Sequence, residues 1–345
     1  MTSVLDQPEM LEPVIALGRS RAIAAGVDAC EYDAITATLG RASDWTAAFR
    51  AAGAAHLADA RQADSDDRHV TAADAYLAAT ACCHIATTVP AGDRAGHGEA
   101  ADAMARALAI LQPEAQPLAG ETFRGTLTLQ PADPGAPLVV VVPGLDSSRV
   151  EFYANTVALQ RRGLATLAID GPGQGELAPA TTVRADYNTV ITEALDAVLE
   201  TGLAPRSIGL MALSLGGYYG ALALAREPRL QAGVTVSGPS TVVWDQLPGL
   251  LQAILTIRAG TLHAATAFAA QIDVRSFAAQ ITQPLLVIDG ENDIIPGYSN
   301  GADLARLAPH GEHLVIPEGD HLVGNRRWQW LPQAADYLHH NLRPD

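Results

Sequence analysis

The hydrophobic pattern of the first third of the chain predicts an all-helical domain. Alanine-rich segments, separated by breaks rich in Gly, Pro and Asp, recur near residues 10–26, 31–39, 44–63, 69–87 and 97–112. In the fourth segment the three-to-four spacing of one buried helix face is followed by Val70, Ala73, Leu77, Ala81, His84 and Ile85. Nothing returns at a fixed period, which argues against a helical-repeat protein. We therefore expect a helical N-terminal domain over residues 1–115.

The pattern changes after Pro113, where short β-rich runs begin to alternate with helical stretches. The runs are Thr122–Leu129, Leu138–Val142, Ala165–Asp170, Ser207–Ala212, Gly233–Ser237, Pro284–Asp289 and His313–Ile316. Continuous apolar runs such as LVVVV and LLVI are typical of strands buried on both faces. Residues 116–345 are therefore predicted to form an α/β domain, with a mostly parallel central sheet flanked by helices.

One interval in this second part is too long for a simple crossover between strands. About 45 residues separate Gly238 from Pro284, and they include the helical pattern WDQLPGLLQAILTIRAGTLHAATAFAA. A helical cap inserted above the sheet, at about 240–282, is the expected explanation.

Composition narrows the function classes. The 345 residues carry a formal net charge of −16, which argues against a nucleic-acid binder. Lysine is absent, which excludes Schiff-base chemistry, pyridoxal phosphate attachment and a phosphate-loop lysine. Three cysteines form no disulfide framework, and no membrane span or secretory signal is visible. We expect a cytoplasmic protein that acts on a small molecule and needs no cofactor. A homodimer is the candidate assembly.

Ser214 is the candidate nucleophile. It lies in Ala212-Leu213-Ser214-Leu215-Gly216, directly after the strand pattern SIGLMAL and before the helical stretch GGYYGALALA. This is the strand–turn–helix context of a nucleophile elbow, which requires small residues two positions to either side of the serine. Alanine replaces the usual glycine at the first of these positions, an addition of one methyl group. The alternative is a serine that only caps the helix.

A serine hydroxyl needs a base, and the base needs an orienting acid. On this type of sheet the acid and then the base follow the serine, at the ends of later strands. Asp293 follows the strand PLLVIDG, and His321 follows the strand HLVIP, so these two complete the predicted triad. The rivals are expected to be structural or to lie at the surface: Asp289, Glu291, Asp320, His310, His313, His339 and His340.

The oxyanion formed during acyl transfer needs backbone donors. One should be the N–H of Leu215, and the second is expected from Leu145 in the loop that follows LVVVV. The segment 171–176, GPGQGE, is not a dinucleotide fingerprint, because the last glycine of that motif is replaced by Glu176. The acidic trio Asp289, Glu291 and Asp293 is a weak cation signal, so no metal is expected.

Three segments together carry a family resemblance: PGLDSSRVEF, LATLAIDGPGQGE and MALSLGGYYG. They resemble a branch of the α/β-hydrolase superfamily that has a helical N-terminal domain. The branch includes 2,6-dihydroxypseudooxynicotine hydrolase, fungal hydrolases that shorten polyketide chains, and fermentation–respiration switch esterases. The helical segment TAADAYLAATACCHIA is also similar to its N-terminal domain. The resemblance implies the α/β-hydrolase fold and the same triad of Ser214, Asp293 and His321.

The branch contains two chemistries. Some members cleave a carbon–carbon bond next to a ketone, with an acidic cap residue that helps to hold the substrate, and others hydrolyse esters. Asp245 lies in the corresponding region, although it is equally expected to cap the helix that follows. The further candidate substrate contacts are Asp146, Trp244 and Tyr218. The predicted function is hydrolysis of a β-diketone or acyl-aromatic substrate. The alternatives are a carboxylesterase or thioesterase, an acyltransferase or cyclase, and a non-catalytic binding protein.

Overall fold

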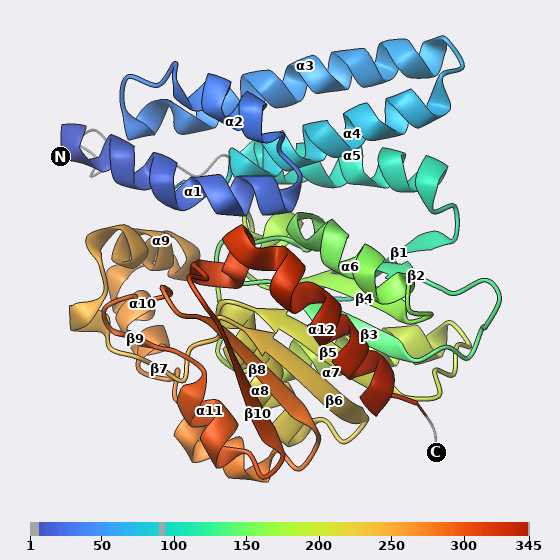
Figure 1. Ribbon diagram of the computed structural model, residues 1–345, viewed down its shortest axis with the longest axis vertical. Coiled ribbons are helices and arrows are strands. Elements are labelled where there is room, and N and C mark those ends of the chain that lie inside the picture. Colours follow the sequence, from blue (N-terminus) through green and yellow to red (C-terminus); the bar gives the residue numbers. More distant parts are fainter. Residues whose placement is uncertain (1–6, 90–93, 344–345) are drawn as a thin grey trace. The chain divides into compact units, whose positions relative to one another are not determined.

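The computed structural model describes residues 7–89 and 94–343 of the chain (Figure 1). It divides into two compact units, residues 1–115 and residues 116–345. None of the helices in the described ranges is both long enough and apolar enough to cross a membrane.

The first unit is helical throughout its described part. Its α-helices are α1 (Leu11–Ala25), α2 (Ala29–Thr36), α3 (Trp45–Ser65), α4 (His69–Ile85) and α5 (Arg94–Leu111), with short 3-10 turns at Pro8–Met10 and Ala42–Asp44. Helix α1 ends at Gly26, whose φ of 114° only glycine adopts readily. An aromatic cluster of Tyr32, Trp45 and Phe49 is almost completely buried, with ring centroids 4.6–6.0 Å apart.

The single buried face predicted for the fourth helix is wrong in part. Val70 at its start is exposed, and Leu77 is only half-buried. From Ala79 to Ile85 every residue of α4 is buried. The reason is that α4 packs between α3 and α5, so that neighbouring helices cover its second half on more than one side.

The second unit is built on an eight-stranded sheet in the order β1-β2-β4-β3-β5-β6-β8-β10. The strands are β1 (Ala115–Ala119), β2 (Arg124–Thr128), β3 (Leu138–Val142), β4 (Ala165–Asp170), β5 (Ile208–Leu213), β6 (Leu230–Val236), β8 (Leu285–Gly290) and β10 (Gly311–Ile316). All neighbours from β4 to β10 are parallel, and β2 pairs with β4 antiparallel. The seven predicted strands are all present; the weakly apolar β1 was not predicted.

Alternate side chains of the central strands enter two separate cores. In β3, Val140 and Val142 lie in one core and Val139 and Val141 in the other. The first core is closed by α7 (Asn188–Glu200), α8 (Leu215–Arg226) and α11 (Ala302–Leu307), and the second by α6 (Tyr153–Gln160) and α12 (Arg327–Asn341). Figure 1 shows α6 and α12 in front of the sheet, with α8 behind it. The sequence therefore folds as the predicted helix-covered α/β sheet, because its strands are apolar on both faces.

The interval between β6 and β8 forms the predicted helical insertion. It contains α9 (Gly249–Ala259), α10 (Leu262–Ala269) and short 3-10 turns, the first at Trp244–Gln246. A two-residue strand at its start, β7 (Thr241–Val242), pairs antiparallel with β9 (Tyr298–Ser299), which follows β8. This pairing ties the base of the insertion to the loop that carries Asp293, and it was not predicted.

Candidate active site

Ser214 lies in a sharp turn between β5 and α8. Its φ of 53° and ψ of −131° are far from the helical values of the residues that follow. Such a φ is strained for a residue with a Cβ atom, and strain of this kind is concentrated at functional sites. The serine side chain makes no capping bond to α8, so the alternative of a capping serine is wrong.

Small residues around the turn explain how this strain is accommodated. A methyl group on Gly216 would lie 2.6 Å from the carbonyl oxygens of Val142 and Pro143, so glycine is required there. A methyl group on Gly220 would lie 2.7 Å from the Cβ atom of Ala212, two positions before the serine. The alanine that replaces the usual glycine is therefore accommodated because glycine faces it from α8.

The three residues that sequence reasoning grouped together form one hydrogen-bond chain. His321 Nε2 lies 2.9 Å from Ser214 Oγ, and His321 Nδ1 lies 2.9 and 3.0 Å from the two carboxylate oxygens of Asp293. The Asp293 side chain is 1% exposed, and that of His321 is 32% exposed. An N–H at Nδ1 donated to Asp293 leaves the Nε2 lone pair facing the serine hydroxyl. This is the arrangement that accepts a proton from the serine.

The rival acidic residues are used elsewhere. Asp289 is completely buried and lies 2.8 Å from Nε2 of His313, and it also accepts the backbone N–H of Gly301. Glu291 accepts the N–H of Glu318 and so connects the two loops that carry the acid and the histidine. Asp320 exchanges two hydrogen bonds with Asn325 and braces the histidine loop.

The loop that presents His321 has a strained backbone and is fixed by a hydrogen bond to the end of β6. Leu322 and Val323 have φ values of 64° and 50°, uncommon for branched side chains. The buried hydroxyl of Ser237, just after β6, accepts the N–H of Leu322 at 2.9 Å. Ser237 thus connects the end of a central strand to the residue that follows the histidine.

Tyr298 is a site residue that sequence reasoning missed. Its hydroxyl donates to the carbonyl oxygen of Ser237. Its ring meets that of His321 edge-on, with centroids 5.9 Å apart. Burial, and then the charge of Asp293, raise the pKa of Tyr298 well above its usual value, so the phenol keeps its proton. No local signal marks this tyrosine, because the β7–β9 pairing brings it to the site.

The loop expected to supply an oxyanion donor approaches the serine closely. A methyl group on Gly144 would lie 2.8 Å from Ser214 Cβ and 3.2 Å from its Oγ. Leu145 is the next residue, half-buried against the first core. Leu215 directly follows the serine, and the roles of the Leu145 and Leu215 amides as oxyanion donors stay a prediction.

Gln174 holds this loop in place. The side chain is 1% exposed, and its amide donates at 2.8 Å to the carbonyl oxygens of both Pro143 and Gly144. Its own carbonyl accepts the N–H of Gly171 and the hydroxyl of Tyr187. The segment GPGQGE, which is no dinucleotide fingerprint, thus places its glutamine against the loop that carries Leu145.

A buried ion pair joins the same two segments a second time. Asp170, at the end of β4, is completely buried and accepts the backbone N–H of Arg149 at 2.6 Å. The Arg149 guanidinium also contacts Asp170, and it bridges to Glu176. The GLDSS and DGPGQGE segments, which carry the family resemblance, are thus interlocked around the serine.

The predicted substrate contacts differ in their surroundings. Asp146 and Trp244 are half-buried, and Asp245 is exposed. Asp245 does not cap the following helix, because α9 begins after Pro248 and has no side-chain cap. Tyr218 is buried, and its hydroxyl donates to the carbonyl oxygen of Gln271 in the inserted segment. That bond gives Tyr218 a packing role, while contact of these four residues with substrate stays a prediction.

The sheet order, the strained serine turn and the Ser–His–Asp hydrogen-bond chain define an α/β-hydrolase. The model of the alpha/beta hydrolase family matches residues 139–340, more than half of the chain. The chain therefore belongs to this family.

The chain is also similar to two characterised relatives and to one solved structure. The chain is 30% identical to 2,6-dihydropseudooxynicotine hydrolase of Paenarthrobacter nicotinovorans, over 61% of its own length and 59% of that protein. It is 34% identical to 20-hydroxy-prefusarin hydrolase of Gibberella moniliformis, over 30% of its length and 26% of that protein. The crystal structure of 2,6-dihydroxy-pseudo-oxynicotine hydrolase superposes with a TM-score of 0.82 at 23% identity, covering 94% of this chain and 95% of that one.

These matches confirm the resemblance to the branch with a helical N-terminal domain. The sequence matches cover less than two thirds of either curated relative. The structural match, at 23% identity, shows the shared fold.

Proposed function

We propose that the protein is a serine hydrolase in which Ser214 is the nucleophile, His321 the general base and Asp293 the acid that orients the histidine. The observation that carries the proposal is the chain of hydrogen bonds from Ser214 Oγ through His321 to Asp293. A buried carboxylate beside Nδ1 stabilises the imidazolium that forms when Nε2 takes the serine proton.

The reaction proceeds through an acyl-enzyme. Ser214 Oγ bonds to the substrate carbonyl carbon while its proton passes to His321, and the amides of Leu145 and Leu215 stabilise the oxyanion. When the carbonyl reforms, the bond to the leaving group breaks, and His321 returns the proton to the leaving atom. Water then attacks the acyl group, gives a proton to His321, and releases the acid together with the regenerated serine.

The proposed substrate is a β-diketone or an acyl-aromatic ketone, cleaved at the carbon–carbon bond next to the carbonyl. The leaving group is then a carbanion, stabilised by the second carbonyl of the diketone or by the aromatic ring. Its protonation by His321 gives a C–H bond, so the products are a carboxylic acid and a ketone or an arene. Support comes from the branch to which the chain belongs, in which some members catalyse this cleavage. Asp245 is the proposed cap residue that holds the substrate, since it is exposed and caps no helix.

Ester or thioester hydrolysis is the second candidate, because the same triad and the same oxyanion donors serve it. Transfer of the acyl group to an internal nucleophile would use the same acyl-enzyme and would leave no oxygen from labelled water in the product.

The test is a turnover assay of one preparation on an activated short-chain ester and on an aryl β-diketone of similar size, with Ser214→Ala as the control. Cleavage of the diketone with comparable or better kcat/KM, lost in Ser214→Ala, supports carbon–carbon hydrolysis. Turnover of the ester alone overturns it in favour of an esterase. A wild-type enzyme that cleaves neither and does not react with a fluorophosphonate would overturn the serine hydrolase itself.

A further inference from the structure

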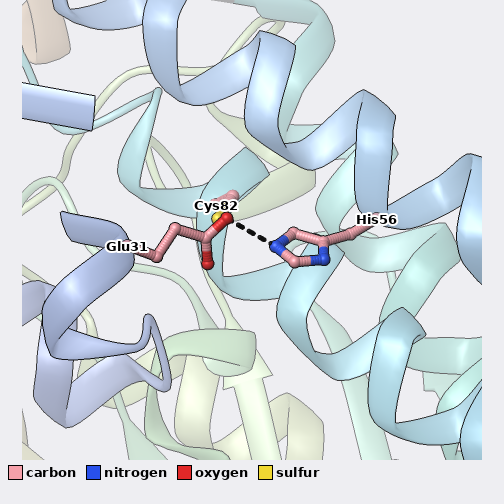
Figure 2. Close-up of side chains that lie close together, drawn as sticks. All are labelled: Glu31, His56 and Cys82. Carbon is pink, nitrogen blue, oxygen red and sulfur yellow. Dashed lines mark hydrogen bonds and ion pairs between the residues drawn. The ribbon is translucent and has the colours of Figure 1, made fainter. Parts of the chain in front are cut away.

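A cluster in the helical unit combines three side chains of the types that bind transition metals. Glu31 comes from α2, His56 from α3 and Cys82 from α4 (Figure 2). One ligand atom from each lies within 4.8 Å of the other two. His56 Nε2 and Glu31 Oε1 are 2.7 Å apart. The residues are about 25 positions apart in the sequence, so no local motif marks them.

We propose that Glu31, His56 and Cys82 bind a zinc ion that ties helices α2, α3 and α4 together. Zinc accepts a thiolate, an imidazole and a carboxylate in one tetrahedral site, whereas calcium and magnesium require oxygen ligands. Bond lengths of about 2.0–2.3 Å place tetrahedral ligand atoms about 3–4 Å apart, so small side-chain rotations complete the site.

The burial of the three residues fits a site at the edge of the helical unit. Cys82 is completely buried, whereas the side chains of His56 and Glu31 are 25% and 29% exposed. The sulfur therefore approaches the ion from the interior, and the two other ligands leave a solvent path for entry. Water supplies the fourth ligand, as in other zinc sites with three protein ligands.

The environment of Cys82 does not suit a reactive thiol. The residue is completely buried beside the Glu31 carboxylate, whereas reactive cysteines lie in partly exposed, electropositive surroundings. A bound cation would offset the negative charges of the thiolate and the carboxylate. On binding, the sulfur bonds to zinc and its proton leaves to solvent, while neutral His56 binds through Nε2 and keeps its proton on Nδ1.

The site is separate from the triad, and its binding can be read without any activity. All three cysteines of the chain lie in residues 1–115, so a metal–thiolate signal reports on the helical unit alone. Cys30 is exposed and adjacent to Glu31, which makes it a matched control. Cys83 packs its sulfur against Gly53 of α3 and is not one of the three residues whose ligand atoms meet within 4.8 Å.

The first experiment titrates the chelator-treated full chain with cobalt(II), whose bond to a thiolate gives a near-ultraviolet charge-transfer band. We expect one equivalent to bind with this band, zinc to displace it, Cys82→Ser to abolish it, and Cys30→Ser to leave it unchanged. Absence of the band in the wild type, or its persistence in Cys82→Ser, overturns the proposal.

The second experiment measures Tm with and without zinc and remains informative if Cys82→Ser does not fold. An ion at about 100 times its Kd should raise Tm by about 5–10 °C in the wild type and in Cys30→Ser. His56→Gln, at a partly exposed position, should fold and lose the increase. An equal increase in His56→Gln would place the zinc elsewhere and overturn the proposal.

Discussion

The most specific consequence of the structure concerns Gln174, a residue that does not reach the reacting atoms. Its side chain makes four hydrogen bonds, two donated to the carbonyl oxygens of Pro143 and Gly144 and two accepted from Gly171 and Tyr187. The substitution Gln174→Leu keeps a similar volume and removes all four. The loop before Leu145 then loses the contact that fixes its distance from the serine.

Two effects of different size are expected. Burial without partners costs about 1–3 kcal/mol per polar group, so a coupled network of this kind should lose roughly 3–5 kcal/mol of unfolding free energy. Displacement of one oxyanion donor lowers kcat by about 100- to 1000-fold, with a smaller change in KM. The activity loss should therefore appear at temperatures where the variant is still folded.

Gln130→Leu is the matched control. Gln130 also donates to two backbone carbonyls, of Gln160 and Leu164, at 3.1 and 2.9 Å. It follows β2, which runs antiparallel to β4, and therefore lies at the amino ends of the parallel strands, away from the serine. It should lower Tm and leave kcat within a few-fold of the wild type.

The assay combines urea unfolding, kcat on whichever substrate the wild type cleaves, and the rate of fluorophosphonate labelling. Two results would refute the reasoning. One is a Gln174→Leu enzyme that keeps kcat within threefold of the wild type. The other is a Gln130→Leu enzyme that loses as much activity as Gln174→Leu.

Three further predictions test the site and the domain around it. Asp293→Asn should lower kcat by roughly 10³–10⁴, because an amide favours the wrong histidine tautomer, whereas Asp289→Asn should cost about 1–3 kcal/mol of stability and leave kcat within a few-fold. Tyr298→Phe should lower kcat about tenfold and cost about 1 kcal/mol of stability, because it removes the hydrogen bond to Ser237, which itself holds the residue after the catalytic histidine. Hydrogen bonds from Arg229 lower the pKa of Glu227 to about 2. A lowered folded-state pKa adds stability above the unfolded value of about 4.3 and loses it toward pH 2, so the stability gap between the wild type and Glu227→Gln should close as pH falls from about 5 to 2.

Each of these has a result that would contradict it. Equal kcat losses for the two aspartate variants would show that the choice between the acids is not made by geometry. Wild-type kcat in Tyr298→Phe would make the tyrosine a packing residue alone. A stability gap that is constant from pH 7 to pH 2, in chemical denaturation of wild type and Glu227→Gln, would mean that the carboxylate gains nothing from its partners on folding.

Much of the fold was predictable because its signals are local. A run such as Leu138–Val142 is apolar on both faces, so its strand must be covered on both sides. The turn at Ser214 is marked by small residues on either side of it, and the candidate acid and base follow later strands of the same sheet. Parallel strands present their carboxyl ends at one edge, so their order along the chain implies that these loops meet.

In the helical unit, the prediction of which helix faces are buried was less accurate. The three-to-four pattern of α4 located the helix but not its burial, because the pattern is strongest for a helix with one solvent face. From Ala79 onward α4 has no solvent face, and small side chains such as alanine carry little periodic signal.

The sequence by itself determined the class of sheet, the place of the nucleophile and the loops in which its partners had to lie. Only the tertiary structure decided that Asp289 pairs with His313 while Asp293 pairs with His321, that Gln174 holds the oxyanion loop, and that β7 brings Tyr298 to the histidine. It also brought together Glu31, His56 and Cys82 from three helices. The physical reason is that periodicity reports how one segment meets solvent and core, whereas a hydrogen bond between distant segments depends on how those segments pack in three dimensions.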